Sequence, residues 1–196
     1  MATNKILYEY GTPLLFADHA TDFVYPATDP TAANNMIVGT PTPTEVQANW
    51  SVIASAAAWQ SAKTATLVDT GTAWPIEWVL GACMESTATP AAGGKFDFYW
   101  NSTPNSTAAN GNSGGCSGTD LAYTAAAQKQ LKFVGSMIVR ANVINIDSMI
   151  GVFTMPYIYG SLVMFNNTSV AMVADADADQ CYVTVTPRIT HIQAAA

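Results

Sequence analysis

One stretch of the sequence alternates large apolar and polar side chains with a period of two. Residues 95–101 read Lys-Phe-Asp-Phe-Tyr-Trp-Asn. Successive side chains of an extended strand point to opposite faces, so Phe96, Phe98 and Trp100 would share one face. Three large apolar side chains are costly to leave in water. The pattern therefore predicts a half-buried β-strand whose even-numbered aromatic residues lie in the core.

Similar short apolar runs, separated by Gly, Pro and Asn, fill most of the second half of the chain. Their inner faces are expected to carry Ile76, Trp78 and Leu80 in the first run, then Leu131, Phe133, Met137 and Val139, and finally Cys181, Val183 and Val185. Strands do not alternate with helical patterns, which argues against a parallel α/β fold. We predict an all-β fold, an antiparallel jelly-roll-like β-sandwich with an extended N-terminal arm.

The arm is predicted to comprise residues 1–36 and the sandwich residues 37–196. Pro13, Pro26 and Pro30 exclude a continuous helix, and no strand period is visible. Five aromatic residues could serve as partner-binding anchors: Tyr8, Tyr10, Phe16, Phe23 and Tyr25. Either the arm packs over its own domain, or these anchors reach a neighbouring subunit.

Charged residues are scarce. Only 21 of the 196 residues are charged, 7 Lys or Arg and 14 Asp or Glu, or 11% of the chain. A typical soluble domain carries roughly a quarter. Such a chain hides surface against neighbours or is covered by small neutral polar groups, and both alternatives fit a repeated part of an assembly.

The charge and cysteine content exclude several partners and compartments. With a net charge of −7 and only Lys129 and Lys132 close together, the sequence predicts no nucleic-acid binding. Residues 148–174 are uncharged, but Pro156 and Gly160 interrupt them and no basic cluster flanks them, so we expect two strands and no membrane span. Three cysteines without CxxC spacing and the lack of a secretory signal predict synthesis in a reducing cytoplasm.

Motifs that could carry chemistry are weak. Ser113 in Gly-Asn-Ser-Gly-Gly resembles the surroundings of a protease nucleophile, yet His19 and His191 are the only histidines and neither lies in a matching motif. The match lies in a loop, residues 101–127, that is rich in Gly, Ser and Asn. We therefore predict no catalytic residues, no cofactor and no enzyme activity.

Acidic and aromatic residues leave two further hypotheses. Asp175, Asp177 and Asp179 have the spacing of a calcium loop, but the turn glycine and the bidentate glutamate are missing. We predict no metal site there, although a different metal site using these carboxylates stays open. Trp59, Trp74 and Tyr99 could stack on sugars, so a carbohydrate-binding module is an alternative. Glu77, Glu85 and Asp97 alone do not make a case for glycoside hydrolysis.

The order of several segments carries a resemblance. The pieces are Asp97-Phe98-Tyr99-Trp100, residues 111–120, residues 129–136, residues 151–156 with Tyr159-Gly160, and residues 187–193. In this order, over about residues 57–193, the chain resembles a group of structural proteins of tailed bacteriophages. Those proteins share a DxYW strand before a Gly/Ser/Asn loop, a KQLxFIGS strand, a GVFxP…YG turn and a TPxxxxIQ ending. The resemblance brings no catalytic residues.

The resemblance implies a virion component, foremost a capsid decoration (cement) protein that binds the major capsid protein and stabilises the head. We expect a homo-oligomer, a trimer or a dimer, on the outer surface of the head, since an acidic chain sits poorly beside packaged DNA. A tail, adaptor or receptor-binding component of the virion is the alternative.

Overall fold

Eleven β-strands and one short 3-10 helix make up the regular structure of the part of the chain that the structure describes. The structure, a computed structural model, describes residues 5–20, 23, 42–51, 53–64, 77–140, 145–157, 159–173 and 181–193. The elements are β1 (Lys5–Tyr10), β2 (Leu14–Ala17), β3 (Thr44–Gln47), β4 (Ala58–Gln60), β5 (Glu77–Glu85), β6 (Lys95–Thr103), β7 (Leu121–Ala122), the 3-10 helix η1 (Ala125–Gln130), β8 (Lys132–Ile138), β9 (Asn145–Phe153), β10 (Tyr159–Asn167) and β11 (Tyr182–Gln193).

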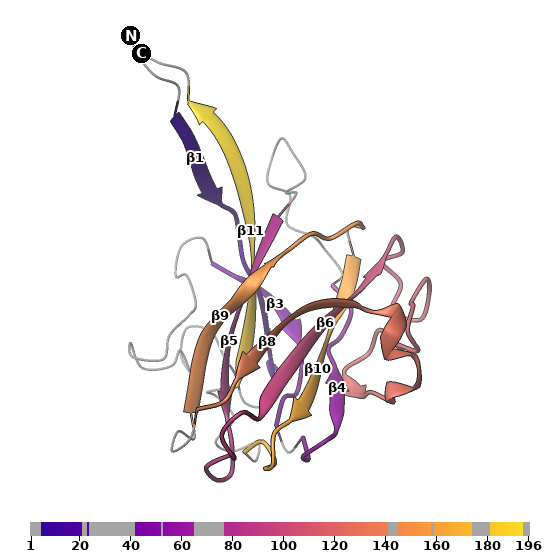
Figure 1. Ribbon diagram of the computed structural model, residues 1–196. Helices are drawn as coiled ribbons and strands as arrows, with labels where there is room; N and C mark the ends of the chain where they lie inside the picture. The colour runs from indigo at the N-terminus through magenta and orange to yellow at the C-terminus, as the bar shows by residue number, and fades with distance from the viewer. Residues whose placement is uncertain are drawn as a thin grey trace.

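The strands form two sheets packed face to face, so the predicted all-β sandwich is confirmed (Figure 1). Sheet A has the order β3-β2-β11-β5-β9, with β1 paired to β11, and sheet B has the order β7-β4-β10-β6-β8. One pair departs from the predicted antiparallel arrangement, because β2 and β3 run parallel. Residues 18–43 join these two strands and supply the long connection that a parallel pair needs.

Four antiparallel pairs are nested within one another along the chain. They are β2 with β11, β4 with β10, β5 with β9, and β6 with β8. The first and third pairs lie in sheet A and the other two in sheet B. The chain from β2 to β11 therefore follows the path of one long hairpin rolled into two layers, and the two ends of that hairpin leave the sandwich together.

Beyond the sandwich the hairpin continues as a two-stranded ribbon. Strand β11 pairs with β5 as far as Arg188, and from Arg188 to Gln193 it pairs with β1. We call these paired segments, residues 5–10 and 188–193, the β1–β11 ribbon. It projects away from the two sheets (Figure 1).

Strand β2 corrects the prediction that residues 1–36 form an arm separate from the sandwich. Leu14–Ala17 lies within sheet A between β3 and β11, and all four side chains are fully buried. Phe23 is also buried, against Cys83 and Tyr182. The boundary predicted between residues 1–36 and 37–196 thus cuts through one sheet. A strand covered on both faces has no alternating pattern, which is why Leu-Leu-Phe-Ala gave no strand period.

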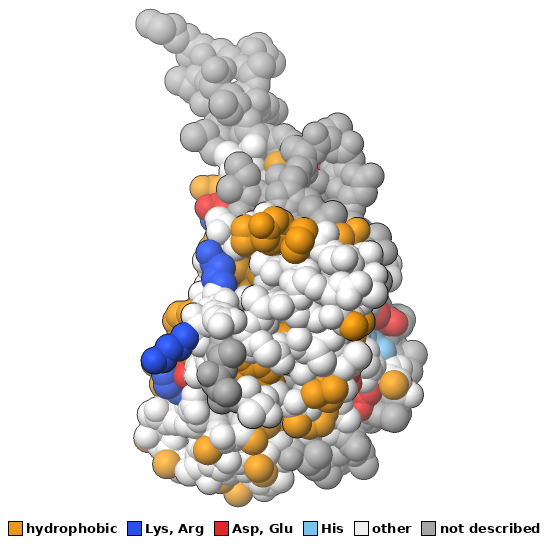
Figure 2. Space-filling model, turned by 90° about the vertical axis from the view of Figure 1, so that its right-hand side faces the viewer, with side chains coloured by type: hydrophobic (Ala, Val, Ile, Leu, Met, Phe, Trp, Pro, Cys, Tyr) orange, Lys and Arg blue, Asp and Glu red, His pale blue; other side chains and the backbone are white. Residues whose placement is uncertain are grey.

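Residues 104–131 lie over the outer face of sheet B. Tyr123 and Leu131 pack there against Val163 and Phe165 of β10 and form a second, smaller core. The Lys63 ammonium donates to the carbonyl oxygens of Asn105, Thr107 and Asn110, at 3.2, 2.7 and 2.6 Å, and so fixes the loop by its backbone. Most of the surface on this side of the molecule is uncharged (Figure 2).

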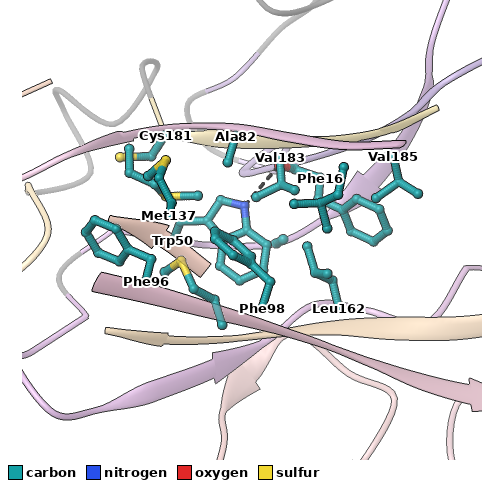
Figure 3. Close-up of a cluster of buried hydrophobic side chains, with 14 of the residues drawn as sticks. Phe16, Trp50, Ala82, Phe96, Phe98, Met137, Leu162, Cys181, Val183 and Val185 are labelled. Carbon is teal, nitrogen blue, oxygen red and sulfur yellow. Dashed lines mark hydrogen bonds between the residues drawn. The ribbon is translucent and has the colours of Figure 1, made fainter. Parts of the chain in front are cut away.

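The main core fills the space between the sheets (Figure 3). Phe96, Phe98 and Trp100 are fully buried, as the period of two predicts. They meet Val183 and Val185 of β11 across the sandwich, which confirms the expected inner face of the last strand. Trp50 lies among them from an irregular segment, and its indole N–H donates to the Phe16 carbonyl oxygen at 2.9 Å.

The inner face predicted for β8 is wrong at two positions. Met137 and Val139 lie in the core between the sheets, but Leu131 is buried in the outer cluster and Phe133 is 53% exposed. The pairing of β6 with β8 shifts register between Phe98 and Tyr99, and Val134 is the extra residue. A bulge of this kind reverses the faces on one side of it. Phe133 therefore lies beside Tyr99 on the outer face of sheet B, with ring centroids 5.3 Å apart.

We predict that Gly160→Ala destabilises the protein by about 1–3 kcal/mol, the usual cost of overpacking a core. A Cβ at this position would overlap the Trp100 indole and lie 2.6 Å from the Asn101 carbonyl oxygen. Urea unfolding followed by tryptophan fluorescence measures the effect. Gly151→Ala is the matched control in β9, because its Cβ would lie 3.7 Å from its nearest neighbour, the Val134 carbonyl oxygen. Equal stability of the two variants would contradict the prediction.

Candidate functional site

The β1–β11 ribbon exposes large apolar side chains. Leu7, Tyr8 and Tyr10 are 45, 57 and 54% exposed. A two-stranded ribbon is marginally stable in water without a third strand or a covering layer. The ribbon is therefore the part of the described structure that most needs a partner surface.

Both faces of the ribbon are partly apolar. Residues that stand opposite each other in an antiparallel pair point to the same face. Tyr8 stands opposite Thr190 and Tyr10 opposite Arg188, which places both tyrosines on one face. Leu7 and Glu9, with Ile189 opposite Glu9, lie on the other. A partner that covers one face only would leave either Leu7 or the tyrosines in water.

Arg188 fixes the base of the ribbon. Its Nε and Nη2 both donate to Oε2 of Glu77 on β5, at 3.0 and 2.6 Å, and this hydrogen bonding raises the pKa of Arg188. The same guanidinium lies over the Tyr8 ring, 4.6 Å from its centroid. A cation held against an aromatic face restricts both groups. Arg188 thus joins the Tyr8 face to the sandwich and orients it before any partner binds.

The five predicted anchors divide into three groups. Tyr8 and Tyr10 lie exposed on the ribbon, and their role in binding a partner stays a prediction. Phe16 and Phe23 are enclosed by their own domain and are core residues, so the prediction that they bind a partner is corrected. Tyr25 lies outside the described residues.

Sequence reasoning missed the C-terminal half of the site. Arg188 is 111 residues from Glu77 and far from Tyr8, and no local pattern links the three. The available signal was the length of the last strand-like run, which continues past Pro187 with Arg-Ile-Thr-His-Ile. This run is longer than the other strand-like runs of the sequence, so its last residues could extend beyond the sheet.

The structure places the candidate nucleophile away from His19. Ser113 Oγ donates to Oδ1 of Asn101 at 2.8 Å. The two ring nitrogens of His19 lie 3.0 and 3.2 Å from the carbonyl oxygens of Leu15 and Phe23. The side chain of His191 lies outside what the structure describes. The prediction that the protein is no enzyme therefore stays a prediction.

The candidate carboxylates and sugar-binding aromatic residues are engaged within the fold. Glu77 pairs with Arg188, and Asp97 pairs with Lys95 at 2.9 Å. Trp59 donates its indole N–H to Asp120 at 2.7 Å, and Tyr99 packs between Phe133 and Phe165. Trp74 and the acidic residues Asp175, Asp177 and Asp179 fall outside the described ranges. Within those ranges, no three His, Cys, Asp or Glu side chains are grouped as metal ligands would be.

All three cysteines are buried, and none of them forms a disulfide. Burial raises the pKa of the Cys116 thiol from 9.0 to about 12. The pKa of Tyr123 rises from 10.0 to about 12, through burial and then through the nearby Cys116. A thiol with so high a pKa stays protonated at neutral pH and is a poor nucleophile.

Comparisons of the chain with protein-family models, with curated proteins and with solved structures gave no match in any of the three. None of the helical structure in the described residues is long and apolar enough to cross a membrane.

We predict that the free energy of unfolding falls as the pH rises from 9 towards 12. Cys116 and Tyr123 bind their protons more tightly in the folded state, so their contribution is complete below the unfolded pKa values and is lost above them. Urea unfolding at about pH 8 and about pH 10.5 measures the loss, since these values bracket the onset of ionisation. Cys116→Ala should lose less stability between the two pH values, and an unchanged loss would contradict the assignment to this thiol.

We predict that Arg188→Leu loosens the ribbon without unfolding the sandwich. The variant keeps apolar bulk but loses the bonds to Glu77 and the contact with Tyr8. The backbone amides of residues 7–10 should then exchange with solvent at least about threefold faster, because local opening becomes less costly. Arg140→Leu, at an exposed position after β8, is the control and should leave these amides unchanged. Equal protection in both variants would contradict the role of Arg188.

Proposed function

We propose that the protein is a structural component of a bacteriophage virion, a capsid decoration (cement) protein that binds the major capsid lattice on the outside of the head. The observation that carries this proposal is the β1–β11 ribbon, which projects from the sandwich and exposes Leu7 on one face and Tyr8 and Tyr10 on the other. An element that its own domain leaves uncovered on both faces is best explained as one that is covered in an assembly.

The proposed fold is a jelly roll, and the nested strand pairs support it. Numbered along the chain, strands β2, β4, β5, β6, β8, β9, β10 and β11 give the sheet orders 1-8-3-6 and 2-7-4-5. Eight strands rolled in this way form two Greek keys, an architecture used by viral capsid and lectin domains. This support is an analogy at the level of the fold, since one fold carries many functions.

The surface supports the same proposal. The chain has a net charge of −7, and an acidic subunit is better placed on the outer shell than beside packaged DNA. Its few charges leave a mainly neutral face over residues 104–131 (Figure 2). Such a face can lie beside other subunits without burying unpaired charges, which is the costly step in forming an interface.

The proposed mechanism is stabilisation by linkage. A ligand that binds only the assembled lattice adds its binding free energy to the stability of that lattice. The tyrosines and Leu7 would provide most of that energy by inserting into apolar pockets of the major capsid protein. Arg188 would reduce the entropic cost of binding because it already holds the Tyr8 ring. Synthesis in the reducing cytoplasm of the host agrees with three cysteines that form no disulfide.

The same ribbon could attach the subunit to a tail or an adaptor. The number of copies per particle separates the two proposals, because decoration proteins cover a whole lattice whereas tail parts follow the lower symmetry of the tail. Quantitative mass spectrometry of purified virions measures this number against the major capsid protein. A ratio close to that of the lattice supports decoration, and a few copies per particle would support the tail.

We predict that Tyr8→Asp/Tyr10→Asp binds heads lacking this protein at least about tenfold more weakly than wild type, because two aromatic anchors would be replaced by carboxylates. Co-sedimentation of the purified chain with such heads measures the affinity. Tyr157→Asp is the matched control, because Tyr157 is 51% exposed but lies between β9 and β10. Circular dichroism should show both variants folded. Equal binding of the two variants would refute attachment through the ribbon.

A further inference from the structure

The two lateral sides of the sandwich are formed by different edge strands. One side has β8 and β9, and the other has β3 and β7, because these strands end the two sheets. We call them the β8–β9 side and the β3–β7 side. Each end strand has one neighbour within its own sheet, so these strands form the lateral edges of the sandwich.

The β8–β9 side carries most of the exposed cations in an acidic chain. Lys132 begins β8, Arg140 follows its end, and both are exposed, as is Lys129 just before the strand. Lys132 and Arg140 are about 25 Å apart along the extended chain. Lys95 is opposite Ile138 and is neutralised by Asp97, and Asp147 on β9 is the exposed carboxylate of this side.

The β3–β7 side is acidic. Glu45 on β3 is exposed, Asp120 just before β7 is partly exposed, and Asp18 at the end of β2 is buried. The nearby Lys63 is buried, with its ammonium on three carbonyl oxygens, and does not offset the exposed Glu45 at the surface. In Figure 2 the Lys and Arg side chains lie along the left margin together with some Asp or Glu side chains, whereas the right margin shows Asp, Glu and His side chains and no Lys or Arg.

Exposed apolar residues accompany the charges on both sides. On the β8–β9 side, Phe133, Ile138, Met149 and Val152 are 53, 68, 58 and 46% exposed. On the β3–β7 side, Leu121 of β7 is 40% exposed. Apolar area supplies affinity, and opposite charges at the rim select the partner and its orientation.

The charges also disfavour a contact between the β8–β9 sides of two copies. Two β8 strands meeting about a two-fold axis would bring Lys132 and Arg140 near the same cations of the other copy, and like charges facing each other are destabilising. Cations on an edge strand are a common protection against such self-pairing. They do not oppose an acidic neighbour.

From this charge arrangement we infer that copies of this chain pack head to tail, with the β8–β9 side of one copy against the β3–β7 side of the next. The inference rests on the proposed role as a repeated subunit and names a second copy of the chain as the neighbour. Contacts between unlike surfaces generate rings when the rotation closes. The ribbon takes no part in this contact and stays available for the lattice.

Sedimentation velocity of the purified chain, without particles, tests the inference. At about 0.01 M salt the screening length is about 30 Å, and the weight-average mass should rise with protein concentration. At about 0.15 M salt, where the screening length is about 8 Å, the association constant should fall about tenfold or more. A chain that stays monomeric at both salt concentrations overturns the inference. That result would not bear on attachment through the ribbon, which the co-sedimentation experiment tests separately.

Charge-reversed variants identify the two sides. Lys132→Glu/Arg140→Glu makes the β8–β9 side acidic, and Glu45→Lys/Leu121→Lys makes the β3–β7 side basic. Each variant alone should be monomeric at low salt, because its two sides now carry like charge. An equimolar mixture should associate again, because the reversed side of one variant suits the reversed side of the other. No recovery in the mixture overturns the pairing of these two sides.

Ala88→Glu/Thr89→Glu is the control for net charge. It adds acidic charge at two exposed positions between β5 and β6 and leaves both sides unchanged. This variant should associate as wild type does. If it is monomeric like the charge-reversed variants, overall repulsion explains their behaviour and the inference fails.

Discussion

The pairing of β11 with β2 and β5 is the constraint on which the rest of the structure depends. Strand β11 contributes Val183 and Val185 to the core between the sheets and Tyr182 to the small core outside sheet A. It also brings the N-terminal strand into the sheet that residues 77–85 and 145–153 complete. Because β11 is longer than its neighbours, its last residues extend beyond the sandwich and pair with β1. The ribbon is thus the unrolled end of the same hairpin that builds the fold.

The scarcity of charge takes a specific form in three dimensions. Among the described residues, three charged groups are buried, and each has a partner. Lys63 donates to loop carbonyl oxygens, Asp18 accepts from the Gln47 side-chain amide, and Asp97 contacts the exposed Lys95 and the Asn167 side-chain amide. The outer layer over sheet B is fixed largely by neutral hydrogen bonds and by the cluster around Tyr123 and Phe165. The remaining exposed charges are therefore few. Exposed cations lie mainly on the β8–β9 side, and the exposed Glu45 lies on the β3–β7 side. In the proposed assembly this separation of charge would orient neighbouring copies relative to one another.

Two kinds of contact follow for the proposed virion subunit. The ribbon is apolar on both faces and is oriented by Arg188, which suits insertion into a partner. The lateral sides combine opposite charges with exposed apolar residues, which suits weaker contacts between copies. In the proposed role, attachment through the ribbon would anchor each copy and the lateral contacts would join neighbours. The fold alone would not separate this role from that of a lectin, because both use the same rolled sandwich.

The sequence by itself determined the strands whose two faces differ. Phe96, Phe98 and Trp100, and likewise Val183 and Val185, are buried as the period of two requires, because alternation is a local property that survives any arrangement of the sheets. Tyr8 and Tyr10 were recognisable as candidate anchors for a similarly local reason, since they are aromatic residues in a segment without a core pattern.

Only the tertiary structure decided the rest. Leu14–Ala17 is covered on both faces and so had no period to detect, and this turned a predicted arm into a central strand. One extra residue in β8 placed Phe133 on the outer face of sheet B, and this change depends on the register of β8 with β6. The pairing of Arg188 with Glu77 and the division of charge between the two lateral sides depend on which distant strands become neighbours. Strand order is set by the packing of the whole chain, and a local pattern carries no information about it.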